Sequence, residues 1–305
     1  MGGSGGYFTK KDAENVIKQI RKSEDKTQNV ELDSQVSVFI NDLLRSYNNR
    51  DAEQIQQHLE SIKKALEKEI EGTIDLIFGG SISRHTYVDG FSDVDSLVIL
   101  DSCELANETP SSAKEYMAQR LRERFPNTPI TTGDLAVTVN FATAKVQLVP
   151  AVRCENDITI SDGNGKKWLK IKPKEFSKAL SNVNEQNSGK LVPMIKIAKG
   201  INSKLPVNQQ LAGYHVESLA IEIFKNYDGA KNTKQMLRHF FNEASARVMK
   251  PIKDKTGQTI HVDDYLGIAE SPERRLCSNA LNRVSRKMKN ADAFNSLQEW
   301  MDILN

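Results

Sequence analysis

The sequence has few cysteines, no long apolar run and almost no net charge. Its three cysteines, Cys103, Cys154 and Cys277, are an odd number at wide spacing, which fits neither a disulfide framework nor a zinc knuckle. No apolar stretch approaches the length that crosses a bilayer, so no membrane association is expected. The opening residues, MGGSGGYFTKKDAE, lack the apolar core of a secretory signal, so the expected location is the cytoplasm.

A formal net charge of +2 over 305 residues is not typical of proteins that coat nucleic acid. Lysine and arginine are concentrated locally, in GKKWLKIKPK at 165–174 and in RVSRKMK at 283–289. Each run fits either a surface that attracts polyphosphate or nucleic acid, or an ordinary solvated face. With 38% apolar and 27% charged residues, the chain is expected to be a soluble globular protein.

Hydrophobic periodicity predicts an α+β fold in which helices precede and follow a mixed sheet. Residues 8–71 have helical spacing, and their apolar side chains form two stripes: Val36, Phe39, Ile40, Leu43 and Leu44, then Ile55, Leu59, Ile62 and Leu66. Branched and aliphatic runs predict strands at 73–78, 94–100, 135–141 and 145–152, with hairpins at 142–144 and 162–165. A helix capped by Thr109 separates the second and third strands, and helices are expected near 173–187, 190–203, 211–228, 232–249, 272–290 and 294–304.

Two aspartates one residue apart open the second predicted strand, in FGGSISRHTYVDGFSDVDSLVIL at 78–100. Alternate residues of a strand share a face, so Asp93 and Asp95 point the same way while Val94 points into the core. Two parallel carboxylates in a cleft repel each other, and a divalent cation removes that conflict. The pair therefore predicts a metal site.

A Gly-Gly-Ser turn precedes this carboxylate pair. Gly79 and Gly80 allow the backbone to approach a phosphate closely, and the hydroxyls of Ser81 and Ser83 can donate hydrogen bonds to it. Taken alone, Ser-Asp-Val-Asp at 92–95 is equally consistent with an Asx-type turn at the start of a strand. No phosphate loop of the G-x-x-x-x-G-K-[ST] type and no nucleophile elbow is present.

The combination of an apolar strand, Gly-Gly-Ser, an irregular gap and Asp-apolar-Asp resembles the signature of the DNA polymerase beta-like nucleotidyltransferase superfamily. That resemblance implies a third carboxylate on a neighbouring strand, in a pattern like apolar-Asp-apolar-apolar-Pro. In KVQLVPAV at 145–152 this position is Gln147. An amide can ligate a metal through its oxygen, but it adds no charge and cannot accept the proton of an attacking hydroxyl. Slower chemistry, a base elsewhere such as Asp134, and an inactive enzyme all stay open.

Three C-terminal stretches look like the helical lobe of bacterial CD-NTases, the cGAS/DncV-like enzymes of anti-phage systems such as CBASS. They are SGKLVPMIKIAKGIN at 188–202, GYHVESLAIEIF at 213–224, and the stretch at 261–304 that begins HVDDYLGIAESPERRL. Together with the first motif, the resemblance covers residues 29–305. It implies a bilobed enzyme with a flexible tail and the start of the first helix at 1–28, a nucleotidyltransferase core at 29–172 and a helical domain at 173–305.

This resemblance also implies the reaction, in which nucleoside triphosphates such as ATP condense into short cyclic or linear oligonucleotide second messengers and pyrophosphate is released. Two Mg²⁺ or Mn²⁺ ions held by Asp93 and Asp95 would bridge the triphosphate and align a ribose hydroxyl for in-line attack. The implied partners are nucleoside triphosphates and a downstream effector that binds the product. A regulatory protein or a nucleic acid activator is left open, and no zinc-ligand cluster of the animal cGAS type is visible.

Further residues are expected to bind the substrate. Three of them belong to the Gly-Gly-Ser turn region: Gly80, Ser81 and Ser83. Ser81 would hold the terminal phosphates, and Arg84 lies close enough in the chain to reach the substrate. Lys196 and Lys199 are candidates to neutralise the phosphates, although lysines on an amphipathic helix also place their charge in solvent without any ligand. Tyr214 fits either stacking on a base or packing in the core.

Two other functions fit the same motif. The enzyme could transfer nucleotides to an RNA, DNA or protein acceptor. Alternatively, the glutamine at 147 could make the chain a catalytically weak nucleotide sensor or scaffold.

Overall fold

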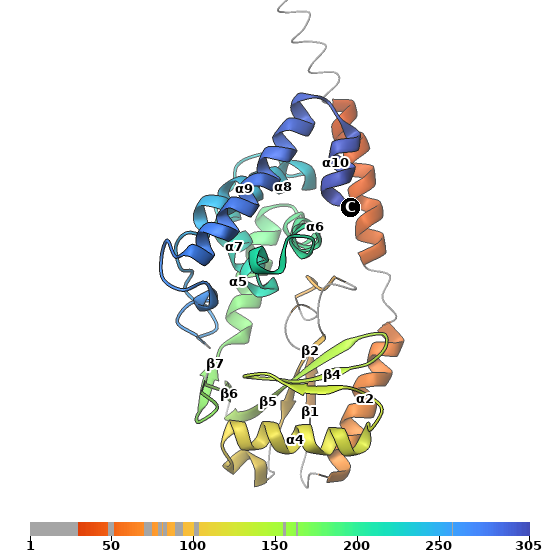
Figure 1. The fold of residues 1–305 in the computed structure, drawn as a ribbon, viewed down its shortest axis with the longest axis vertical. Coiled ribbons are helices and arrows are strands. Elements are labelled where there is room, and N and C mark those ends of the chain that lie inside the picture. The colour runs from red at the N-terminus through yellow and green to blue at the C-terminus, as the bar shows by residue number, and fades with distance from the viewer. Residues whose placement is uncertain are drawn as a thin grey trace, which may run out of the picture.

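The computed structural model describes residues 30–47, 52–69, 75–78, 81, 84–88, 94–100, 104–154, 157–162, 164–257 and 259–305. The chain forms two lobes, one built on a mixed sheet and the other from helices (Figure 1). This arrangement confirms the predicted α+β fold. Within the described part of the chain, none of the helices combines the length and the apolar character that crossing a bilayer requires.

The sheet has seven strands: β1 (Asp75–Phe78), β2 (Val94–Ile99), β3 (Ile130–Thr132), β4 (Val137–Asn140), β5 (Lys145–Cys154), β6 (Asp157–Ser161) and β7 (Trp168–Ile171). The order is β1-β2-β5-β4-β3, and β6 pairs with both β5 and β7. Among these strands β2 and β5 run parallel, and the other pairs are antiparallel. The hairpins predicted at 142–144 and 162–165 are confirmed as the β4–β5 and β6–β7 connections. Sequence reasoning did not predict the short strand β3.

Two helices, α2 (Ala52–Glu69) and α4 (Pro110–Arg124), cover one face of the sheet (Figure 1). The predicted stripe of α2 is confirmed, because Ile55, Leu59, Ile62 and Leu66 are all buried against the sheet. The N-cap of α4 is also confirmed: the hydroxyl of Thr109 accepts a hydrogen bond from the Ser112 amide. The two helices therefore pack on one face of the sheet, and the side chains of Asp95 and Gln147 project from the other.

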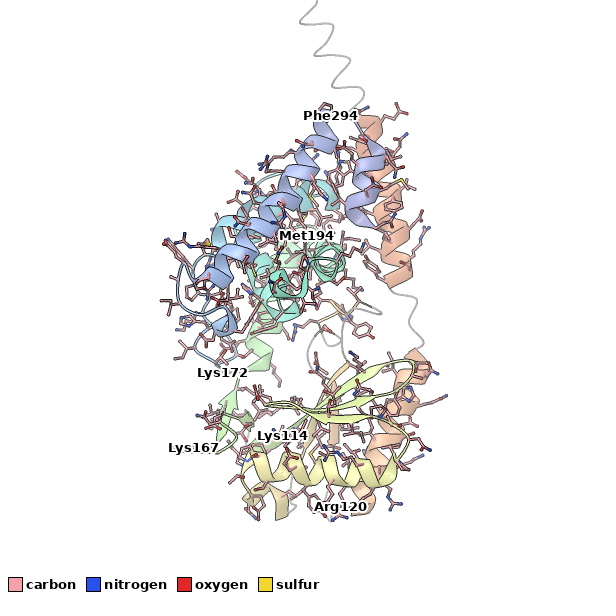
Figure 2. The ribbon with its side chains drawn as sticks, viewed as in Figure 1. Lys114, Arg120, Lys167, Lys172, Met194 and Phe294 are labelled. Carbon is pink, nitrogen blue, oxygen red and sulfur yellow. The ribbon has the colours of Figure 1, made fainter. Side chains whose placement is uncertain are left out.

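Helices form the second lobe: α5 (Pro173–Gln186), α6 (Leu191–Ser203), α7 (Gly213–Phe224), α8 (Thr233–Arg247), α9 (Pro272–Ala293) and α10 (Leu297–Leu304). Each corresponds to a predicted helical segment. The described residues also include three short 3-10 helices, η1 (Glu104–Asn107) in the sheet lobe and η2 (Val207–Gln209) and η3 (Asp264–Leu266) in the helical lobe. The chain passes from β7 into α5 at Lys172, which lies between the two lobes (Figure 2).

The helix at residues 30–47 packs in the helical lobe, beside α10 in Figure 1. Its buried side chains Leu32, Val36, Ile40 and Tyr47 belong to the same apolar cluster as α5 to α10. The predicted division at 29–172 and 173–305 groups this helix with the sheet, whereas its apolar face is covered by the helical lobe. The division near residue 172 stays a proposal, and the predicted tail at 1–28 lies outside the described residues.

Residues 84–88, which follow the Gly-Gly-Ser turn, contact both cores. The side chain of Tyr87 is buried in the apolar cluster of the sheet lobe, and that of Val88 is buried in the cluster of the helical lobe. The amides of Thr86 and Tyr87 both donate to the Ser81 carbonyl, at 2.9 and 3.1 Å. Residues 84–88 therefore contact both lobes and are tied to Ser81 by two backbone hydrogen bonds.

Candidate functional site

A cavity of about 430 Å³ lies between the lobes. The sheet lobe and the segment before β2 contribute Ser81, Arg84, Asp95 and Gln147 to its wall, and the helical lobe contributes Lys199, Tyr214, Glu217 and residues 202–203 and 210–213. The predicted site residues Ser81, Arg84, Asp95, Gln147, Lys199 and Tyr214 thus share one cavity, although they are far apart in the sequence.

Four other predicted residues are not placed in this wall. Gly80, Ser83 and Asp93 lie outside the described residues. Lys196 is half-buried on α6 and is not among the residues that line the cavity. Their roles stay predictions.

Asp95 and Gln147 occupy adjacent positions on the two parallel strands. In the β2–β5 register Asp95 pairs with Gln147, so both side chains project from the same face of the sheet. The flanking residues Val94 and Ser96 are buried on the opposite face. Asp134, the substitute considered for the third carboxylate, is exposed in the turn between β3 and β4 and does not line the cavity. Gln147 is therefore the neighbour of Asp95 on the adjacent parallel strand.

The donor atoms of this wall fit a magnesium ion. Magnesium binds oxygen ligands and commonly takes one or two carboxylates together with substrate phosphates. Asp95 and Gln147 supply a carboxylate and an amide oxygen from neighbouring strands. Within the described residues no group of three acidic, histidine or cysteine side chains could hold a metal. The two side chains could thus hold an ion only together with further oxygens, such as those of Asp93 or a phosphate.

Two cations and one buried carboxylate line the same cavity as Asp95. Glu217 on α7 is fully buried and accepts hydrogen bonds from Lys199 Nζ through Oε1 and from Arg84 Nε through Oε2, each at 2.7 Å. Lys199 Nζ also donates to the carbonyl of Thr86 at 3.0 Å. Burial raises the pKa of the Glu217 carboxyl, but the charges of Lys199 and Arg84 outweigh burial, so the net shift of the pKa is downward. The three side chains together carry one net positive charge.

Tyr214 is fixed at this wall by contacts on both sides. Its hydroxyl donates to Asp254 Oδ1 at 2.9 Å, and its ring lies 4.5 Å from the ring of Phe176, centroid to centroid. The guanidinium of Arg84 lies 5.0 Å from the centroid of the Phe176 ring and 5.7 Å from that of Tyr214. Burial and the charge of Asp254 raise the pKa of the Tyr214 phenol, so it stays neutral. Tyr214 therefore presents an aromatic surface to the cavity, and its ring also packs against Phe176 of the helical lobe.

The remaining wall is a backbone segment held by amide side chains. Asn202 on α6 pairs with the main chain of Leu211, donating to its carbonyl and accepting from its amide, both at 2.8 Å. Gln210 Nε2 donates to the carbonyls of Ser203 and Leu205. Sequence reasoning missed Asn202, Gln210 and Glu217. The available signal for Glu217 was its place in GYHVESLAIEIF, because a charge within so apolar a helix requires a buried partner.

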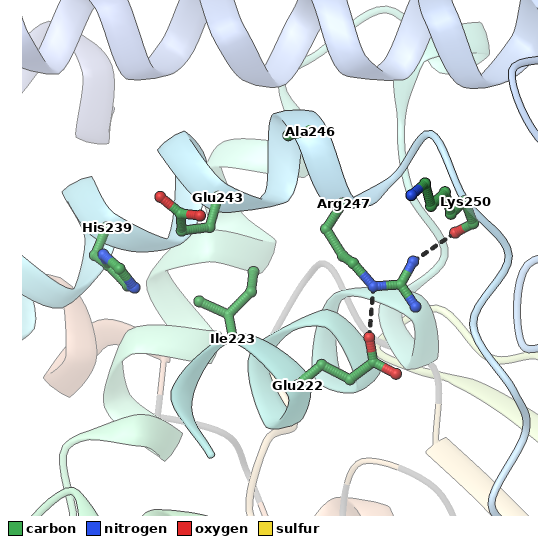
Figure 3. A pocket seen from close by; sticks show the side chains of 7 residues that line it. All are labelled: Glu222, Ile223, His239, Glu243, Ala246, Arg247 and Lys250. Atoms are coloured by element: carbon green, nitrogen blue, oxygen red, sulfur yellow. Dashed lines mark hydrogen bonds and ion pairs between the residues drawn. The ribbon is translucent and has the colours of Figure 1, made fainter. Parts of the chain in front are cut away.

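A second cavity, of about 460 Å³, is formed by α7, α8 and Lys250, which lies beyond the end of α8 in the helical lobe (Figure 3). Its main cation, Arg247, is already paired with Glu222 at 2.6 Å and donates to the carbonyl of Lys250. The other lining residues include His239 and Glu243, and none was predicted to be in a site. This slightly larger cavity therefore contains none of the predicted metal or phosphate ligands that line the cavity between the lobes.

Comparison with known protein families gives a direct match. Residues 30–184 match the model of the SMODS family, described as the Second Messenger Oligonucleotide or Dinucleotide Synthetase domain. This range covers half of the chain and includes Ser81, Asp95 and Gln147. By sequence, no curated protein matches the chain.

Solved structures have the same fold at low sequence identity. CdnC of E. coli MS115-1 with ATP has a TM-score of 0.62 and 15% identity, over 90% of this chain and 95% of that one. The Bradyrhizobium diazoefficiens CD-NTase CdnG in complex with GTP has a TM-score of 0.64 and 11% identity, over 90% and 94%. Vibrio cholerae DncV cyclic AMP-GMP synthase, with the linear intermediate 5′ pppA(3′,5′)pG, has a TM-score of 0.61 and 11% identity, over 97% and 89%. With the matched family and the polar cavity between two lobes of this fold, the chain belongs to the second-messenger oligonucleotide or dinucleotide synthetases, the CD-NTase family of nucleotidyltransferases.

Proposed function

We propose that this nucleotidyltransferase is magnesium-dependent and condenses nucleoside triphosphates into short cyclic or linear oligonucleotides that act in anti-phage defence. The observation that carries the proposal is the pairing of Asp95 with Gln147 in the wall of a cavity that Arg84 and Lys199 also line. Oxygen ligands for a divalent ion thus share one cavity with cations that can bind phosphate. The proposed location is the cytoplasm, where nucleoside triphosphates are available.

Each residue has a proposed task in the transfer. Asp95, together with Asp93, would hold Mg²⁺ or Mn²⁺, and a pair of such ions supplies positive charge to the phosphates and to the attacking oxygen. Ser81, Arg84 and Lys199 would bind the triphosphate, as would Gly80, Ser83 and Lys196 on the sequence evidence. In the step itself a ribose hydroxyl oxygen bonds to the α-phosphorus while the bond to pyrophosphate breaks.

Gln147 limits what the cavity can do with the released proton. A carboxylate at this position could accept the proton of the attacking hydroxyl, whereas an amide oxygen can only orient that hydroxyl or a metal ligand. The proton would then leave through water or through a group outside the pair. This substitution supports a slower reaction than one with three carboxylates, and it is the observation that favours a weakly catalytic nucleotide sensor as the second candidate function.

The test incubates the purified protein with each ribonucleoside and deoxyribonucleoside triphosphate and with Mg²⁺ or Mn²⁺, followed by mass spectrometry. Discrete short oligonucleotides support the proposed reaction. Label transfer only to an added RNA, DNA or protein acceptor supports the acceptor-directed alternative. Nucleotide that is bound but unreacted supports the sensor.

The proposed partners are a downstream effector that binds the product and a regulator, either a protein or a nucleic acid. E. coli CdnC is also solved in a complex with HORMA-deltaN, which supports a protein regulator for a similar fold. A host carrying the natural locus should resist phage with the wild-type chain and become sensitive with Asp95→Asn. Equal plating of phage on both strains would contradict the defence role.

A further inference from the structure

Glu217 is the most completely buried charge at the cavity wall, with an exposed fraction of 0%. Both of its carboxylate oxygens are occupied. Oε1 accepts from Lys199 Nζ and from the hydroxyl of Thr86, and Oε2 accepts from Arg84 Nε. A buried carboxylate is stable only when it is paired in this way, so Glu217 is ionised and fixed in one position.

The groups that Glu217 holds come from two separate parts of the chain. Arg84 and Thr86 follow the Gly-Gly-Ser turn, and Lys199 lies on α6. Both cations also line the cavity that contains Asp95. Both have further contacts, Lys199 with the Thr86 carbonyl and Arg84 with the rings of Phe176 and Tyr214. Because long cationic side chains lose conformational freedom when they are fixed, holding them in advance lowers the entropic cost of binding a triphosphate.

We propose that Glu217 is a positioning residue, which holds Arg84 and Lys199 as a cation pair where the triphosphate of the substrate binds. The inference rests on the proposed function, since it assumes that a nucleoside triphosphate occupies this cavity. One net positive charge is left for the ligand, because two cations face one carboxylate.

The experiment compares the wild type with Glu217→Gln in binding a non-hydrolysable ATP analogue, without turnover. The amide keeps the shape of the side chain but offers an acceptor to only one of the two cations. We expect the Kd of the analogue to rise about tenfold at neutral pH, in line with the loss of a buried charge-assisted contact. Unchanged or tighter binding by a folded variant would overturn the proposal.

Rescue by the conservative variant separates positioning from a merely structural role. Glu217→Asp keeps the negative charge between the two cations, so the Kd of the analogue should return towards the wild-type value, even if the shorter side chain binds less tightly. A Kd for Glu217→Asp as high as that of Glu217→Gln would count against the proposal.

Ser218 provides the matched control on the same helix. It is buried, and its hydroxyl donates only within α7, to the Tyr214 carbonyl at 2.8 Å. Ser218→Ala should lower thermal stability without changing Kd, and an equal rise in Kd for this variant would show that any loosening of α7 has the same effect. If Glu217→Gln does not fold, Thr86→Val decides, because it removes one contact of the carboxylate. A rise in Kd of about threefold supports the proposal, and an unchanged Kd refutes it.

The same measurements distinguish this inference from the proposed function. Binding of the analogue requires no chemistry, so a weakened Glu217→Gln variant supports the positioning role even if no oligonucleotide forms. Conversely, a wild type that makes oligonucleotides and a variant with unchanged binding would retain the function and reject the role of Glu217.

Discussion

Replacing Gln147 with aspartate tests the geometry of the metal site most directly. Gln147 pairs with Asp95 in the parallel register of β2 and β5, so Gln147→Asp places two carboxylates on one face of the sheet at neighbouring strands. The separation of such strands is about 4.8 Å. Without a cation the two charges repel each other, and with Mg²⁺ they attract the same ion.

The size of the repulsion follows from that separation. Two unit charges about 4.8 Å apart interact by roughly 3 kcal/mol at an effective dielectric constant of about 20. Asp95 and Gln147 are both partly exposed, so solvent screening reduces the repulsion to about 1–2 kcal/mol.

Two assays read out this change. In urea denaturation at neutral pH without metal, Gln147→Asp should lower the free energy of unfolding by about 1–2 kcal/mol. In the activity assay, half-maximal activity should need about tenfold less Mg²⁺, the equivalent of about 1.4 kcal/mol of added attraction. Added Mg²⁺ should therefore stabilise the variant more than the wild type.

Thr138 supplies the matched control. It pairs with Gln147 on the other side, in β4, so Thr138→Asp adds the same charge to the same face one strand further from Asp95. The longer distance should give a smaller loss of stability and no gain in Mg²⁺ affinity. If Gln147→Asp and Thr138→Asp behave alike in both assays, the reasoning about position 147 is wrong.

Three further outcomes are expected. Asp95→Asn should abolish oligonucleotide synthesis in the mass-spectrometric assay while the circular dichroism spectrum stays that of the wild type; undiminished synthesis would remove Asp95 from the metal site. Burial, together with nearby cations and despite the attraction of Asp263, lowers the pKa of His215 from 6.5 to about 4, so the unfolded chain binds its proton first as pH falls. Stability from this group is complete above about pH 6.5 and lost towards pH 4, and urea denaturation should show a loss of about 2 kcal/mol between pH 7.5 and pH 5 that His215→Gln lacks. Gly200→Ala would place its Cβ 2.3 Å from the Tyr47 hydroxyl, so we expect a destabilisation of about 1–3 kcal/mol that Tyr47→Phe reduces; a wild-type Tm for Gly200→Ala would contradict the contact.

The elements with strong periodicity could be predicted from the sequence. The α2 stripe from Ile55 to Leu66 faces the sheet as expected, because helical spacing alone determines which side chains share a face. The parallel pairing of β2 with β5 and the strand β3 could not be predicted. Pairing partners far apart in the chain are chosen by tertiary packing, and the three residues of β3 are too few to show alternation.

For the candidate site, the sequence indicated residue types better than their contacts. Asp95, Gln147 and Ser81 could be selected because a known motif ties them together, and they do line one cavity. Lys199 was a candidate to neutralise the phosphates, with a solvated lysine as the alternative, but nothing in its spacing shows that a carboxylate from α7 holds its amine at 2.7 Å. Contacts between separate helices, such as this pair, become visible only when the lobe is assembled.

The helix at 30–47 makes the helical lobe discontinuous in the sequence. Its buried side chains Leu32, Val36 and Ile40 pack with α5 to α10, although the whole sheet lobe separates them along the chain. A fragment that begins at Pro173 would lack these side chains and expose the apolar surface that they cover, so the helical lobe is expected to fold only as part of a chain that includes this helix.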